Sequence, residues 1–142
     1  MSSRHRSREL AVQMAFQWEV HPETMAQDTA LERFWQGQAR SSDDNRPFFE
    51  LLVRGMANHL PQIDEIIDRS LQNWKFARVA KVDLAILRVA VFEMLFSSDP
   101  EKPDLAVSIN EALEMAKKFG SADSAGFING VLDSIAQSLK KS

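Results

Sequence analysis

The sequence of 142 residues contains no cysteine, which excludes disulfide bonds, thiolate nucleophiles and cysteine-based zinc sites. It also lacks the Gly-rich phosphate loop, the HExxH zinc motif and the nucleophile elbow of known enzyme classes. Its three histidines, His5, His21 and His59, are scattered and form no metal-binding motif. The sequence therefore predicts no catalytic residue, no metal site and no cofactor, and a non-enzymatic function.

Long apolar segments are also missing, because no uninterrupted apolar run approaches the roughly 20 residues that span a bilayer. The basic N-terminus is not followed by an apolar stretch, so it does not read as a signal peptide. With a net charge of −3, whole-molecule attraction to nucleic acid is not expected, and a basic patch would have to be local. We expect one cytoplasmic domain covering residues 1–142, without a membrane partner.

The most apolar stretch is the segment 82–96, VDLAILRVAVFEMLF, in which Asp83, Arg88 and Glu93 are the charged residues. Apolar residues would surround nearly the whole circumference of a helix with this sequence, which is typical of a buried central helix. Asp83 is expected to be its N-cap, because a carboxylate there accepts hydrogen bonds from the unpaired amides of the first turn. Other helices must then cover this helix on several sides.

Amphipathic patterns before the central segment predict three of these covering helices. Thr24 is expected to cap one that runs to about Gln38, and the polar residues 37–45 indicate a loop. Pro47 suits the first turn of the next helix. The periodicity continues past Pro61, so the third and fourth helices are predicted to be nearly continuous.

Two further helices are predicted after the central segment. Asp104 is a suitable N-cap for the first of them, and Gly120 is expected to end it in the left-handed conformation. Either Ser121 or Asp123 can begin the last helix.

The last helix contains Gly126 and Gly130, four residues apart, a spacing that lets another backbone approach closely at a cost of about 1 kcal/mol each in helix propensity. In total, the sequence predicts six or seven helices and no strand. The fold class is therefore all-α, a compact irregular bundle.

Arg4, Arg6 and Arg8 crowd the beginning of a helix predicted over residues 3–20, where the helix dipole disfavours each cation by about 0.3–1 kcal/mol. Two interpretations stay open: an arm that binds phosphate, or a frayed and solvated tail. Phe16 falls on the arginine side of this helix, where an exposed ring can stack on a base of single-stranded RNA. The alternative is that Phe16 packs against another helix.

A second candidate site is the segment 117–127, KKFGSADSAGF. It combines two lysines, a glycine turn, hydroxyl groups and the amides at the start of a helix, which together can bind an anion or RNA. The same composition is equally typical of a turn between two helices.

Four segments resemble the NusB family of bacterial transcription antitermination factors in the same order and spacing: RSRELAVQMAFQWE, VDLAILRVAVFEMLF, INEALEMAKKFG and SxxFINGVLD. Between residues 23 and 75 the resemblance rests on the helical pattern alone. It implies two small helical subdomains around the buried central helix. It also implies a non-catalytic scaffold that binds the boxA element of ribosomal RNA leader transcripts together with NusE, a small-subunit ribosomal protein, within the antitermination complex of RNA polymerase.

The family resemblance also implies which residues bind. Asp83 matches the acidic position associated with NusE. His5 replaces a common arginine and Phe16 a common tyrosine, so we expect weaker RNA binding by the protein alone and more reliance on the partner. The residues implied to contact RNA are Arg4, His5, Arg6, Arg8, Phe16, Lys118, Phe119, Gly120, Asp123, Ser124 and Phe127.

Two other functions remain open at this stage. One is a NusB-like accessory domain of a ribosomal RNA methyltransferase, which the absence of a catalytic domain before Ser142 argues against unless the chain is truncated. The other is a protein-only helical adaptor or homodimer whose basic N-terminus is merely solvated.

Overall fold

The computed structural model describes residues 3–25, 28–37 and 45–140. Within these ranges the chain forms seven α-helices and no strand, which confirms the all-α prediction. Three short helical turns, η1, η2 and η3, connect or extend them. In chain order the elements are α1 (Ser3–Val20), η1 (Pro22–Thr24), α2 (Asp28–Gln36), α3 (Arg46–Asn58), α4 (Leu60–Arg69), η2 (Phe76–Arg78), α5 (Lys81–Val91), η3 (Phe92–Phe96), α6 (Leu105–Phe119) and α7 (Ser124–Lys140).

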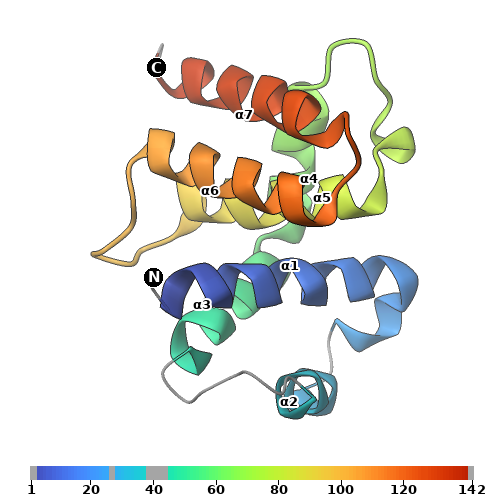
Figure 1. Cartoon of the computed structure of the whole chain (residues 1–142), viewed down its shortest axis with the longest axis vertical. Helices are drawn as coiled ribbons and strands as arrows, with labels where there is room; N and C mark the ends of the chain where they lie inside the picture. Colours follow the sequence, from blue (N-terminus) through green and yellow to red (C-terminus); the bar gives the residue numbers. More distant parts are fainter. Residues whose placement is uncertain (1–2, 26–27, 38–44, 141–142) are drawn as a thin grey trace.

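The α5 helix is the centre of the molecule, as predicted. Every residue from 83 to 94 is buried, including the charged Arg88 and Glu93. Helices α1, α3, α4, α6 and α7 all pack against α5. Figure 1 shows α1, α2 and α3 on one side of the molecule and α6 and α7 on the other, so the bundle divides into two helical groups around this helix.

The start of α5 differs from the prediction. Ala80 is the N-cap residue, and Asp83 is the third residue of the helix, so the prediction that Asp83 is the cap is wrong. At the other end, α5 continues directly into η3, a π-helical turn. The wider turn places Glu93 inside the bundle, and the ring of Phe92 lies against Gly55, where an added Cβ would be 2.1 Å from Phe92 Cζ.

Thr24 does not cap α2. Its hydroxyl donates to the carbonyl of His21 (2.8 Å) within η1, and α2 begins later, at Asp28. The predicted loop of residues 37–45 falls mostly on residues 38–44, which lie outside the described ranges. The near-continuity of α3 and α4 is confirmed, because His59 alone separates them.

The prediction that Gly120 adopts the left-handed conformation is wrong. Gly120 ends α6 with φ −93° and ψ −171°, which is extended rather than left-handed backbone. Glycine is needed there for space, because a Cβ would lie 2.4 Å from the Oγ of Ser124. Conversely, a Cβ on Gly126 or Gly130 would meet nothing within 4 Å, so neither residue mediates close packing inside the described chain.

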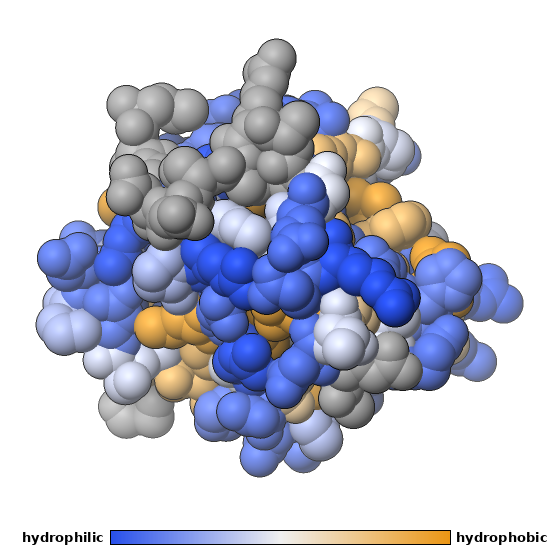
Figure 2. Space-filling view, turned by 90° about the horizontal axis from the view of Figure 1, so that it is seen from below, coloured by the Kyte–Doolittle hydropathy of each residue, from blue (hydrophilic) through white to orange (hydrophobic). Residues whose placement is uncertain are grey.

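The end of the molecule formed by α2 and α3 is mostly hydrophilic, with smaller apolar areas between the polar side chains (Figure 2). Arg46 pairs there with Glu32, and Arg54 pairs with Asp28 at 3.0 Å. Over the described residues, none of the helices combines the length and the apolar character that a membrane span requires.

Candidate nucleic-acid interface

Arg8 of α1 is buried and ties three elements together. Its Nε and Nη2 donate to the two carboxylate oxygens of Glu93 in η3, at 2.6 and 3.0 Å, and its Nη1 donates to Glu111 of α6 at 2.7 Å. Burial alone lowers the pKa of Arg8, but the hydrogen bonds and charges of Glu93 and Glu111 outweigh burial and raise it. Arg8 can contact a phosphate only if these bonds open.

Glu9 is the buried anion that joins the start of α1 to the end of α6. Its carboxylate oxygens lie 2.9 Å from Lys118 Nζ, 3.2 Å from Arg6 Nη1 and 3.2 Å from His5 Nε2. Desolvation raises the pKa of Glu9, but hydrogen bonds from Lys118 and Arg6, together with the charges of Lys118 and His5, outweigh it and lower the pKa. His5 also contacts Glu111 through Nδ1, at 3.1 Å.

These charged residues surround a hollow of about 460 Å³ between α1 and α6, which we call the α1–α6 hollow. Lys117 and Lys118 contribute to its α6 side. The side chain of Lys118 is 55% exposed although its amine is paired, and Lys117 is exposed. Within the described ranges, no group of three His, Asp or Glu side chains is arranged to hold a metal ion. Three permanent cations, Arg6, Lys117 and Lys118, thus line the hollow together with the carboxylates of Glu9 and Glu114.

Arg4 is held at the far end of the basic segment. Its guanidinium pairs with Asp99 at 2.8 Å and Glu101 at 3.4 Å, and lies 4.2 Å from the centroid of the Phe48 ring. The basic start of α1 is thus helical and ion-paired. Neither interpretation from the sequence, a free phosphate-binding arm or a frayed tail, describes it fully.

The turn between α6 and α7 is shaped by its hydroxyl groups. The backbone amide of Ser121 donates to Ser124 Oγ at 2.9 Å, and Ser124 itself is buried. Asp123 is exposed, and its carbonyl accepts from the amide of Phe127 at 3.1 Å. Gly120 and Ser124 therefore form the turn, while Asp123 faces solvent.

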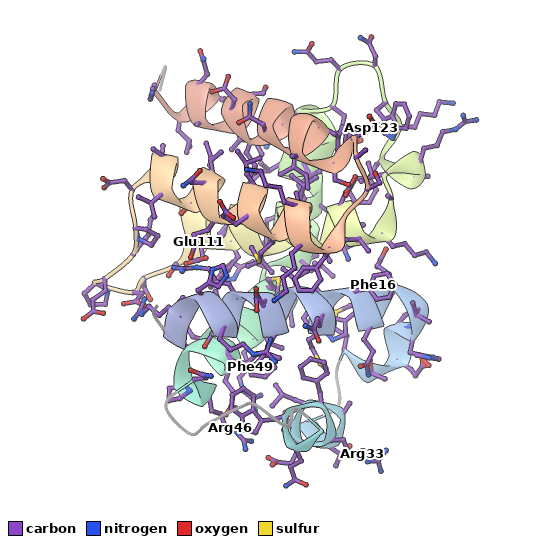
Figure 3. All side chains as sticks on the ribbon, in the orientation of Figure 1. Phe16, Arg33, Arg46, Phe49, Glu111 and Asp123 are labelled. Carbon is purple, nitrogen blue, oxygen red and sulfur yellow. The ribbon has the colours of Figure 1, made fainter. Side chains whose placement is uncertain are left out.

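Phe16 lies in an apolar groove of about 490 Å³ bordered by α1, α2, the end of α6 and the start of α5; we call it the Phe16 groove. The ring is 37% exposed, and Phe34, Val82 and Phe119 line the same groove. Phe16 is therefore neither enclosed in a helix contact nor surrounded by arginines. Figure 3 labels Phe16 on α1 and Glu111 on α6. The same view labels Asp123 at the turn that leads into α7.

Asp83 lies beside this groove, next to Val82, and is only 8% exposed. Its Oδ1 is buried and accepts no hydrogen bond from any residue that the structure describes. A buried carboxylate oxygen without a donor is uncommon and unfavourable. Any partner at this position would have to reach a carboxylate that lies below the surface.

A comparison with protein families identifies the chain. The model described as "NusB family" matches residues 5–137. The chain belongs to the NusB family. The transcription antitermination protein NusB of Anaeromyxobacter dehalogenans (strain 2CP-1) is 44% identical over 138 residues, which cover 97% of this chain and 93% of that protein. NusB of Bacillus subtilis (strain 168) is 41% identical over 139 residues, 98% of each chain.

Solved NusB structures share the fold of this family member. NusB of T. maritima has a TM-score of 0.81 and 32% identity, covering 94% of this chain and 90% of that one. A chain of a crystal structure of the antitermination factors NusB and NusE in complex with dsRNA has a TM-score of 0.82 and 21% identity, covering 97% and 98%. At that identity the second likeness concerns the fold alone.

The structure separates the implied RNA-binding residues of this NusB family member into three groups. His5, Arg6 and Lys118 meet at the α1–α6 hollow, and Phe16 and Phe119 share the Phe16 groove. Asp123 and Phe127 lie at the start of α7, at and just after the α6–α7 turn. Of the remaining implied residues, Arg4 and Arg8 are ion-paired, Ser124 is buried, and Gly120 packs against Ser124 in the turn.

Sequence reasoning missed the acids that organise these cations. Glu9 is three residues after Arg6 and four after His5, a spacing that favours ion pairs on one helix face. Glu93 lies within an apolar segment, and a buried carboxylate requires a counter-charge. Those two signals are present in the sequence, but the identity of the partner across the fold is not.

Proposed function

We propose that this protein is a transcription antitermination factor that binds the boxA element of ribosomal RNA leader transcripts together with NusE. It acts as a scaffold without chemistry, inside the antitermination complex of RNA polymerase. The family match over residues 5–137 supports this proposal, and so do the antitermination names of relatives whose own length the chain covers to more than 90%.

The observation that carries the proposal is the α1–α6 hollow. Arg6 from α1 and Lys117 and Lys118 from α6 converge there from opposite ends of the sequence. Glu9 holds Arg6 and Lys118 in place, which reduces the conformational entropy that they would lose on binding RNA. RNA phosphates would compete with Glu9 for these cations, and each contact would release a counterion.

The proposed path of the RNA continues from this hollow along the exposed residues of the α6–α7 turn. Lys118 Nζ lies 5.5 Å from the centroid of the Phe119 ring, so a cation and an aromatic face adjoin at the end of α6. Single-stranded RNA can place a phosphate on the Lys118 amine and a base near the Phe119 ring. Asp123 is exposed on this path and would repel a nearby phosphate.

We place NusE at the start of α5. A donor group from NusE could bond to the Oδ1 of Asp83, which has no partner among the described residues, if NusE covers Val82 at the α5 edge of the Phe16 groove and leaves Phe119 to the RNA. The apolar lining of this groove is suited to a protein surface. The same property supports a second candidate, a homodimer or a protein-only adaptor in which this groove is covered by another chain. Elution volume on size exclusion, with and without NusE, separates these states.

Fluorescence anisotropy of labelled RNA tests the proposed specificity. Purified protein is titrated into boxA RNA and into a scrambled RNA of the same composition, at several salt concentrations. We expect tighter binding to boxA and a linear fall of log K with log salt. Equal affinities for the two sequences, with and without NusE, would exclude the boxA assignment, and no binding of either RNA would leave the protein-only adaptor.

A further inference from the structure

The connection between α4 and α5 carries a tryptophan that the fold leaves in solvent. Trp74 is 55% exposed, whereas Trp18 and Trp35 are 1% and 6% exposed. Its ring lies 6.4 Å from the ring of Phe127 of α7, centroid to centroid, with 55° between the planes. Phe127 belongs to the proposed RNA surface, so Trp74 extends that surface beyond the α6–α7 turn.

Trp74 forms one side of a groove of about 330 Å³, which we call the Trp74 groove. Gly126 and Gly130 are exposed on α7 and line the groove. A Cβ on either glycine would meet nothing within 4 Å, so internal packing does not explain these two helix-weakening residues. Their effect is to leave the surface of α7 bare, so that a flat ligand can lie against the helix beside the indole.

The polar residues of the groove suit the edge of a base. Gln72 and Asn73 are exposed and line it, and their amides each offer a donor and an acceptor. Neither side chain hydrogen-bonds within the described part of the chain, whereas the hydroxyl of the neighbouring Ser70 donates to the carbonyl of Ile66 at 2.9 Å. Two uncommitted amides thus lie next to an exposed indole.

Three uncommitted cations follow Trp74 in the same connection. Lys75, Arg78 and Lys81 are exposed, and none of them forms an ion pair with another described residue. The cations of the α1–α6 hollow differ, because Arg6 and Lys118 are paired with Glu9. A polyanion can therefore reach the cations after Trp74 without displacing a carboxylate.

We propose that the Trp74 groove binds an unstacked nucleobase of single-stranded RNA, with the flanking phosphates on Lys75 and Arg78. The base stacks on the indole, since rings 6.4 Å apart and tilted leave no parallel slot between Trp74 and Phe127. The inference deepens the proposed function and rests on it. The Trp74 groove adjoins the proposed RNA surface at Phe127, and three cations without a described ion-pair partner follow Trp74 in the chain. Both observations favour RNA over an apolar protein segment as the ligand of the groove.

Tryptophan fluorescence gives a local readout, because Trp74 is the solvent-accessible indole and Trp18 and Trp35 are buried. The protein is titrated with unlabelled boxA RNA and with a uridine homopolymer, while labelled RNA in a parallel anisotropy experiment reports total binding. We expect RNA to quench the Trp74 emission. Replacing Trp74 by Ala should abolish the quenching and weaken binding about 5- to 150-fold, the range for one stacked base.

Gly130→Leu tests the groove without removing the indole. The added side chain fills open space and replaces glycine in a helix, so the variant should fold at least as well as the wild type. We expect it to lose the quenching and to weaken RNA binding. Asn129→Leu is the matched control, because Asn129 is exposed on α7 but does not line the groove, and it should leave both signals unchanged.

The outcomes separate the inference from the proposed function. RNA binding by anisotropy, without quenching and without an effect of Gly130→Leu, would overturn the Trp74 site and leave the proposed function standing. Quenching by the homopolymer as strong as by boxA would support the site while removing the boxA assignment. Quenching by NusE without RNA, blocked by Gly130→Leu, would reassign the groove to a protein partner and overturn the inference.

Discussion

Arg8→Ala removes the positive charge that neutralises Glu93 inside the bundle. Glu93 is 4% exposed and would keep a desolvated carboxylate without a donor, whereas water can reach the side chain of Glu111, which is 21% exposed. Removing one partner of a buried ion pair costs about 3–5 kcal/mol. We expect that loss in the free energy of unfolding, a large share of the roughly 5–15 kcal/mol that stabilises a typical domain.

Urea unfolding followed by the helical signal in circular dichroism measures this loss. The double variant Arg8→Met with Glu93→Met replaces the pair by apolar side chains and should recover most of the stability, because no charge remains buried. Arg33→Ala is the matched control: Arg33 is exposed on α2 (Figure 3) and its removal should change stability by at most about 0.5 kcal/mol. A loss below about 1 kcal/mol for Arg8→Ala would refute the reasoning.

Three further predictions concern packing, pH and RNA. In Gly55→Ala the new Cβ would lie 2.1 Å from Phe92 Cζ, so the free energy of unfolding measured in urea should fall by about 1–3 kcal/mol. An unchanged unfolding midpoint would mean that the Phe92 ring moves away freely. The folded-state pKa of Glu9 is lowered from its ordinary value of 4.5, so the stabilisation from its ion pairs is present above pH 4.5 and is lost as the pH falls through the folded-state pKa. In urea unfolding, Glu9→Gln should therefore lose less stability than the wild type between pH 7 and about pH 3.5. Equal losses in the two proteins would contradict the ion-pair account. Arg6→Ala should weaken RNA binding and reduce the slope of log K against log salt by about 0.7, the share of one phosphate on a single strand, and an unchanged slope would remove Arg6 from the interface.

The helices were predictable because their signals are local. The pattern of apolar residues located α1 and the buried central helix, and Pro47 marked the first turn of α3. Each of these features depends on residues within a few positions of one another, where helix geometry fixes which side chains share a face.

The organisation of the site depends on distant residues and was not predictable in the same way. Arg8 and Glu93 are 85 positions apart, and only the folded chain shows that this arginine is internal. Gly120 illustrates the same limit. A side chain at this position would collide with the Oγ of Ser124, four residues later, whereas the backbone conformation of Gly120 itself does not require glycine. Residue type alone therefore could not indicate that Arg4 and Arg8 are held in ion pairs within the fold.

Two sets of ion pairs join α1 to α6. Glu9 holds cations from both ends of the sequence at the α1–α6 hollow, while Arg8 fixes the separation of the same two helices. We therefore expect substitutions of the buried arginine to act on the fold first, and substitutions of the outer cations to act first on the proposed RNA binding. This distinction can be checked by measuring both quantities on each variant.

The measurement that tests the central claim most directly is the affinity for boxA RNA with and without saturating NusE, at one salt concentration. The account predicts that NusE tightens RNA binding, and that RNA tightens NusE binding by the same factor, because coupling between two sites is reciprocal. An RNA affinity that NusE leaves unchanged would contradict the proposal that the two proteins bind boxA RNA as one unit.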